Sequence, residues 1–163
     1  PCALPIYIRA LSPDEFKIRA LGQLQAAGHD TAGRDADYTA AALALCTDKI
    51  KNLNDVAGYI GFFFRDDVVL DAEAAAQALT SENKPHLATL REAYAGLATF
   101  DADSLMESLK AIAAAREVKN KMLVMPARVA CTGSKVGPSL YHLMEVLGQA
   151  EVLKRFDAAL AGM

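Results

Sequence analysis

The sequence has few of the residues that mark a disulfide-stapled, metal-binding or membrane protein. Its three cysteines, Cys2, Cys46 and Cys131, lie far apart, so they form neither a disulfide framework nor a zinc motif. This usage fits a reducing compartment, and we expect a cytoplasmic protein. Apolar runs fall short of the ~18–20 residues needed to cross a bilayer, so we expect no membrane span. The N-terminus also lacks the charged and apolar regions of a secretion signal.

Motifs that carry catalysis are also missing. There is no Gly-rich phosphate loop and no His-Glu-x-x-His, and His29, His86 and His142 are isolated from one another. The pair Asp66-Asp67 has no further carboxylates at ligand spacing. We therefore expect no catalytic residue, no metal and no cofactor in this chain.

The composition is that of an ordinary globular protein, with 53% apolar and 23% charged residues in 163. This length suits one domain or two small subdomains that share a core. The net charge of −3 conceals a split. Residues 116–163 hold seven basic and four acidic side chains, which is +3, whereas residues 1–115 carry −6. Such asymmetry can mark a polyanion-binding face at the basic end, but taken alone it is better explained by a solvated surface.

Hydrophobic spacing predicts an all-α protein. Ser12-Pro13-Asp14-Glu15 forms a capping box, and Gly28 is a plausible stop for the helix that follows it. Asp71 and Asp101 are placed to cap later helices. Further helices are expected at about 38–51 and 54–64, after Lys84-Pro85, and twice near the end on either side of Gly148.

The segment Tyr59-Ile-Gly-Phe-Phe-Phe64 admits two interpretations. Aromatic rings can stack on unpaired bases, but three consecutive phenylalanines cannot share one helix face. Packing at a helix–helix junction is therefore the better prediction.

The segment from Lys119 to Leu140 is the strongest candidate for a binding site. It places Arg128 on a short apolar helix, followed by a Thr-Gly-Ser-Lys turn and a Gly-Pro that opens the next helix. The N–H groups at a helix start lack partners and carry partial positive charge, so they can receive phosphates or base acceptor atoms. Lys135 and Arg128 add full charges, and splayed RNA bases are read by convergent donors of this kind.

This stretch resembles the C-terminal signature of bacterial glutamyl-tRNA synthetases, a Pro-Leu-Arg-x-Ala-x-Thr-Gly-x-x-x-Gly-Pro pattern, with Ala127 in place of the usual leucine. The ending Leu-Gly-Gln-Ala-Glu-x-Leu-Lys-Arg-Phe is also similar. Upstream, Lys49-Ile-Lys-Asn-Leu53 with the aromatic segment, and the stretch from Tyr7 to Glu15, resemble earlier parts of the same family. The matches are Met125, immediately before this pattern, and within it Pro126, Arg128, Ala130, Thr132, Gly133, Gly137 and Pro138.

The resemblance implies a helical cage of two subdomains that grips the anticodon loop of tRNA(Glu), and tRNA(Gln) stays open as a second partner. ATP and Mg would act in a catalytic domain that we expect upstream of this chain. A lysine at position 49 or 51 stands where the family often has an arginine that inspects one anticodon base, and it lacks the planar, bidentate fork of arginine. The implied tRNA-binding residues are Lys49, Lys51, Lys119, Lys121, Arg128, Thr132, Lys135, Gly137, Pro138, Ser139 and Leu140.

The organisation implied by the resemblance has four segments. Residues 1–6 look like an adapter-derived scar, 7–36 would end a linker region, and 37–115 and 116–163 would be the two subdomains. Two alternatives stay open: the related cage of a class I lysyl-tRNA synthetase, and a free-standing helical adaptor that binds a protein.

Overall fold

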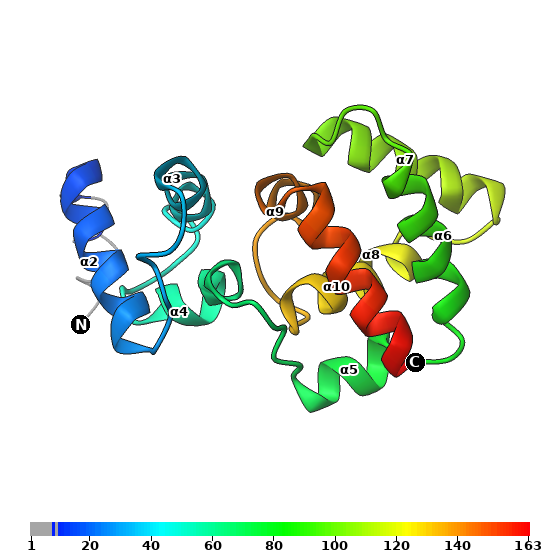
Figure 1. Ribbon diagram of the computed structural model, residues 1–163, viewed down its shortest axis with the longest axis horizontal. Helices are drawn as coiled ribbons and strands as arrows, with labels where there is room; N and C mark the ends of the chain where they lie inside the picture. The colour runs from blue at the N-terminus through cyan, green and yellow to red at the C-terminus, as the bar shows by residue number, and fades with distance from the viewer. Residues whose placement is uncertain (1–7, 9) are drawn as a thin grey trace. The chain divides into compact units, whose positions relative to one another are not determined.

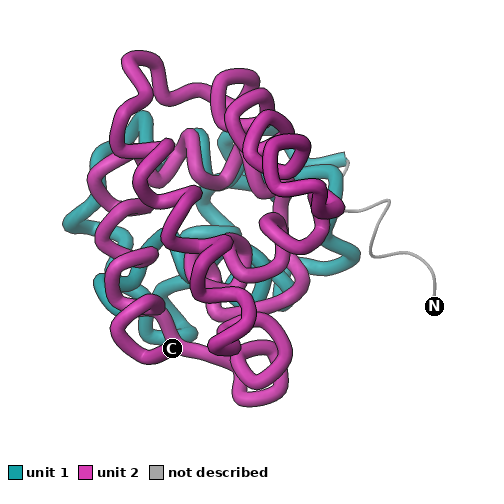
Figure 2. Tube along the Cα trace, turned by 90° about the vertical axis from the view of Figure 1, so that its right-hand side faces the viewer, with its two compact units in different colours: residues 1–67 teal, residues 68–163 magenta. Residues whose placement is uncertain are grey.

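The computed structural model describes residue 8 and residues 10–163, and all regular structure within them is helical, which confirms the predicted all-α class. The predicted scar at 1–6, Cys2, Tyr7 and Arg9 lie outside the described residues. Among the described helices, none is long and apolar enough to span a membrane. The chain forms two compact units, Pro1–Asp67 and Val68–Met163 (Figure 2).

The division into units does not coincide with the predicted segments, which placed a boundary between residues 115 and 116. Helices on both sides of that position share one core, because α6 (Lys84–Ala95) packs against α8 (Lys121–Thr132) and α10 (Gln149–Gly162). The contacts instead divide after Asp67. The cause is the apolar face of α6, whose buried Leu87, Leu90 and Tyr94 need partners that lie later in the chain.

Unit 1 contains α2 (Pro13–Ala26), α3 (Ala36–Ala44), α4 (Asp55–Ile60) and the 3₁₀ turn η1 (Gly61–Phe64). The predicted capping box is present: the Ser12 hydroxyl accepts from the Glu15 N–H, and the Ser12 N–H donates to the Glu15 carboxylate at 3.0 Å. Gly28 follows the end of α2 with a positive φ of 84°. Both ends of this helix are therefore set by local sequence.

Two elements of unit 1 are shorter than predicted. The expected helix 38–51 ends at Ala44, because the N–H groups of Leu45 and Cys46 bond three residues back and the Thr47 hydroxyl donates to the Leu43 carbonyl. The expected helix 54–64 tightens to 3₁₀ form at Gly61, where the His29 ring lies so close that a Cβ would come within 2.6 Å of its Nε2.

The aromatic segment belongs to the core of unit 1. Phe63 and Phe64 are buried, and the Tyr38 ring stands edge-on to both at centroid distances of 6.0 and 6.3 Å. The Tyr38 hydroxyl donates to the Phe63 carbonyl at 2.8 Å. Core packing was thus the correct interpretation for these two phenylalanines, and Tyr59 and Phe62 are partly exposed.

Unit 2 contains α5 (Ala72–Ala78), α6 (Lys84–Ala95), α7 (Ala102–Ala115), α8 (Lys121–Thr132), α9 (Leu140–Leu147) and α10 (Gln149–Gly162). The carboxylates of Asp71 and Asp101 cap α5 and α7 as predicted, each accepting an N–H at 2.8 Å. Gly148 separates α9 from α10 with φ of 81°. In Figure 1, α10 crosses α8 beside α6, and these three helices pack on one another.

Candidate nucleic-acid interface

The loop between α8 and α9 holds most of the predicted binding residues, and hydrogen bonds within unit 2 fix its two ends. At its start the Thr132 hydroxyl lies 2.9 Å from the Arg128 carbonyl and 3.0 Å from that of Ser134, and it accepts from the Ser134 N–H. At its end Arg128 Nη1 donates to the Pro138 carbonyl at 2.7 Å. Arg128 therefore links the helix to the far end of the loop through a charge-assisted hydrogen bond. The sequence had predicted RNA as the partner of this side chain.

Gly133 makes the close approach on which this loop depends. Its φ of 77° is in the left-handed region that glycine tolerates best, and a Cβ there would overlap the Val69 carbonyl oxygen. The Gly133 carbonyl in turn accepts the Asp71 N–H at 2.8 Å. The extended stretch before α5 thus lies directly against the end of α8.

The start of α9 provides the N–H groups that the sequence predicted. Leu143 is the first residue whose N–H bonds back along the helix, to the Ser139 carbonyl at 2.9 Å. The amides of Leu140, Tyr141 and His142 precede it, in the turn whose N–H groups have no partner four residues back. Ser139 is exposed, whereas Leu140 is 3% exposed and anchors the turn in the core. The arrangement can present backbone donors to an anion or to base acceptor atoms.

The side chain of Lys135 bonds to helix α5 and does not extend freely into solvent. Its Nζ lies 2.9 Å from Glu73 Oε1 and 3.0 Å from Gln77 Oε1, both on α5. The hydrogen bond and charge of Lys135 lower the pKa of the Glu73 carboxyl. The predicted phosphate ligand therefore already has an intramolecular partner.

The other predicted residues lie elsewhere. Lys119 and Lys121 are exposed at the start of α8, about 16 Å along the helix axis from its end at Thr132. Lys49 and Lys51 are exposed in unit 1, in the turns between α3 and α4. The structure gathers the segment from Arg128 to Leu140 into one site. The four lysines lie outside it as two exposed pairs, one at 49 and 51 and the other at 119 and 121.

The structure adds residues that the sequence did not single out. Arg155 counts toward the basic end of the chain but is 4% exposed, and its Nη1 donates to the Cys131 carbonyl at 2.6 Å. Its Nε donates to Glu151 at 2.7 Å. Arg155 therefore supports the end of α8. Glu73 and Gln77 show one readable signal, their spacing of four on a helix, but their link to Lys135 spans 62 and 58 residues.

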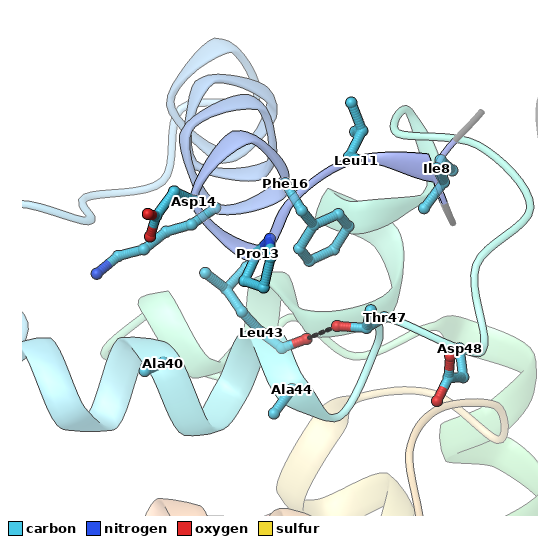
Figure 3. A pocket seen from close by; sticks show the side chains of 11 residues that line it. Ile8, Leu11, Pro13, Asp14, Phe16, Ala40, Leu43, Ala44, Thr47 and Asp48 are labelled. Carbon is cyan, nitrogen blue, oxygen red and sulfur yellow. Dashed lines mark hydrogen bonds between the residues drawn. The ribbon is translucent and has the colours of Figure 1, made fainter.

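A separate hollow of about 500 Å³ lies in unit 1 between the start of α2 and α3 (Figure 3). Its walls are largely apolar, with Phe16 and Leu43 among them, and Asp14 and Asp48 lie toward its edges. The Thr47 hydroxyl at its rim donates to the Leu43 carbonyl at 3.1 Å. None of the predicted binding residues lines it.

Comparison with known proteins identifies the family. The model of the anticodon binding domain family matches residues 15–160, which includes the entire α8–α9 site. The chain belongs to this family. The anticodon-binding domain is 34% identical over 157 residues to a glutamate–tRNA ligase of Nitratidesulfovibrio vulgaris, covering 95% of this chain and 33% of the relative. It is 35% identical over 153 residues to a glutamate–tRNA ligase of Mycobacterium sp. (strain KMS), covering 93% and 31%.

Solved structures support the fold of the anticodon-binding domain. The crystal structure of a glutamate tRNA ligase from Elizabethkingia meningosepticum superposes with a TM-score of 0.81 at 22% identity, over 96% of this chain and 30% of that one. A glutamate-tRNA synthetase from Elizabethkingia anophelis gives 0.75 at the same identity. The chain thus spans about a third of the length of the curated relatives it matches.

Proposed function

We propose that this anticodon-binding domain recognises the anticodon loop of tRNA as part of a glutamate–tRNA ligase, with tRNA(Glu) as its partner. The family match over residues 15–160 carries the proposal, because it spans both the basic turn of unit 1 and the α8–α9 site. The relatives at 34–35% identity are named as glutamate–tRNA ligases. The expected location is the cytoplasm, where tRNA is charged.

The chemistry of the α8–α9 site supports this function. The backbone donors at the start of α9 lie beside a loop held rigid by the bond from Arg128 to Pro138. A rigid set of donors suits unstacked bases, which expose acceptor atoms on their edges. The exposed lysines at 49, 51, 119 and 121 would add contacts to phosphates.

The complete ligase would attach glutamate to tRNA with ATP and Mg, and we propose that this chemistry belongs to the part of the relatives that this chain does not match. The chain alone would then bind RNA without aminoacylating it. Lysine at positions 49 and 51 gives a point charge rather than a bidentate fork. Discrimination between tRNA(Glu) and tRNA(Gln) by this domain should accordingly be weak.

Binding of an anticodon stem-loop RNA tests the proposal. We expect the 163-residue chain to bind the tRNA(Glu) stem-loop more tightly than the same stem closed by an unrelated tetraloop. With one phosphate contacted by each of the four exposed lysines, affinity should fall roughly fiftyfold between about 50 and 200 mM salt. Equal affinity for both RNAs, or affinity that ignores salt, would show that the domain does not read the loop. Tighter binding of a tRNA(Lys) stem-loop would favour the lysyl alternative.

Matched variants locate the contacts. Lys49→Ala with Lys51→Ala should weaken binding and reduce the salt dependence, because two charges are lost. Lys110→Ala on α7 removes an exposed charge from an element outside the proposed contacts and serves as the control. A change in log affinity for Lys110→Ala that is half as large as that for the double variant would mean that only total charge matters.

A further inference from the structure

The side chain of Lys135 closes a small polar cluster with α5. Its Nζ reaches Glu73 Oε1 at 2.9 Å and Gln77 Oε1 at 3.0 Å, and Gln77 Nε2 donates to Glu73 Oε1 at 3.0 Å. Each of the three side chains thus contacts the other two. The Lys135 side chain is 33% exposed and that of Glu73 73%, so the cluster lies at the surface.

The backbone joins the same two elements close by. The Asp71 N–H donates to the Gly133 carbonyl at 2.8 Å, one residue before α5 begins and two residues before Lys135. Beneath the surface, Ala74 and Ala78 of α5 pack with Val129 of α8 in a buried cluster. The first half of the α8–α9 loop therefore packs against α5, and Lys135 adds a side-chain hydrogen bond between the two.

We propose that Glu73, together with Gln77, is a positioning residue for RNA recognition, and that Lys135 acts through it by holding the loop rather than by binding phosphate. This inference rests on the proposed function. Arg128 bonds to Pro138, Thr132 bonds to Ser134, and the Val136 N–H donates to the Ser134 hydroxyl, all within α8 and the loop. Lys135 is the side chain that links the middle of the loop to α5. The backbone donors of α9 follow directly, so a loosened loop would misplace them.

The sign of one mutational effect separates this role from simple electrostatics. Glu73 is an acid beside a site for a polyanion. If charge alone mattered, Glu73→Ala and Glu73→Gln would both strengthen RNA binding. If Glu73 positions Lys135, Glu73→Ala should weaken binding despite the lost negative charge. Glu73→Gln keeps an oxygen that can accept from Lys135 and should bind at least as well as wild type.

The experiment measures affinity for the tRNA(Glu) anticodon stem-loop across a salt series with the full chain. We expect Glu73→Ala to weaken binding by up to about fivefold, the upper end of the range for one exposed ion pair, and Glu73→Gln to restore it. Gln77→Ala should also lower the affinity for the stem-loop, because it removes the second hydrogen bond of Lys135. Glu107→Ala makes the same charge change on a different helix, α7, and should leave affinity within error of wild type or slightly raise it.

Two further readouts decide the role of Lys135. Lys135→Ala should lower affinity while the slope of log affinity against log salt stays constant, because no phosphate contact is lost. A slope that falls by about 0.7 would mean a direct phosphate contact and would overturn the positioning role. Without RNA, Glu73→Ala but not Glu73→Gln should shift the amide resonances of Val136 and Ser139, and unchanged resonances would equally overturn it.

The outcomes distinguish the two proposals. A wild-type chain that fails to bind the stem-loop overturns the proposed function and this inference together. A wild-type chain that binds, with Glu73→Ala equal to or tighter than wild type, overturns the positioning role alone and leaves the anticodon-binding function standing.

Discussion

Replacement of Gly133 by alanine is the perturbation that most directly tests the architecture of the site. Two costs add at this position. A left-handed backbone costs alanine roughly 1–2 kcal/mol relative to glycine. The new methyl group would also overlap the Val69 carbonyl oxygen, and displacement of packed backbone costs roughly 1–3 kcal/mol more. We expect Gly133→Ala to destabilise unit 2 by roughly 2–5 kcal/mol.

Gly28→Ala is the matched control, since Gly28 has φ of 84° and no atom within 4 Å of a built Cβ. It carries only the backbone cost, roughly 1–2 kcal/mol. Native-state hydrogen exchange reads the units separately, with the buried Leu90 and Leu143 reporting on unit 2 and Leu24 on unit 1. If Gly133→Ala lowers the opening free energy by no more than Gly28→Ala does, the close approach to Val69 does not constrain the loop.

Three further predictions follow from buried groups. Burial lowers the pKa of His29, and the charge of Arg65 lowers it further. The unfolded state therefore binds a proton to His29 more readily than the folded state does. Unit 1 should accordingly lose stability as pH falls through about 6.5. His29→Asn should remove that pH dependence in thermal melts. Tyr94→Phe deletes the bond to the Leu105 carbonyl and should cost about 1 kcal/mol in urea unfolding. Burial raises the pKa of both Cys46 and Cys131 to about 12, so peptide mapping after thiol labelling at about pH 8 should find both unmodified until the protein unfolds.

The sequence predicts helices best where the signal is local. The capping residues Ser12, Asp71 and Asp101 and the separator Gly148 all act within a few positions, and each is where it was expected. The predicted helix end at about residue 51 was wrong. The helix ends at Ala44, because side-chain and three-residue hydrogen bonds compete with the helical pattern there. The tightening at Gly61 depends on the His29 ring, which no local pattern reveals.

The binding site shows the same division between local and distant causes. Arg128, the glycine turn and the start of α9 follow one another closely along the chain, so the sequence could predict a site of hydrogen-bond donors there. The hydrogen-bond partners of these residues could not be predicted from the sequence. Arg128 bonds to the Pro138 carbonyl and Lys135 bonds to α5, so charges that the sequence assigned to RNA have partners within the protein. A list of basic residues therefore overstates the number of available phosphate contacts.

The contacts that build the site also set when it can form during synthesis. Lys135 meets Glu73 across 62 residues, and α10, the final helix, packs on both α6 and α8 while its Arg155 bonds to the Cys131 carbonyl. Contacts between residues so far apart along the chain form late. Unit 1 is a compact unit within the first 67 residues, whereas the α8–α9 loop reaches its final shape only after α10 has been synthesised.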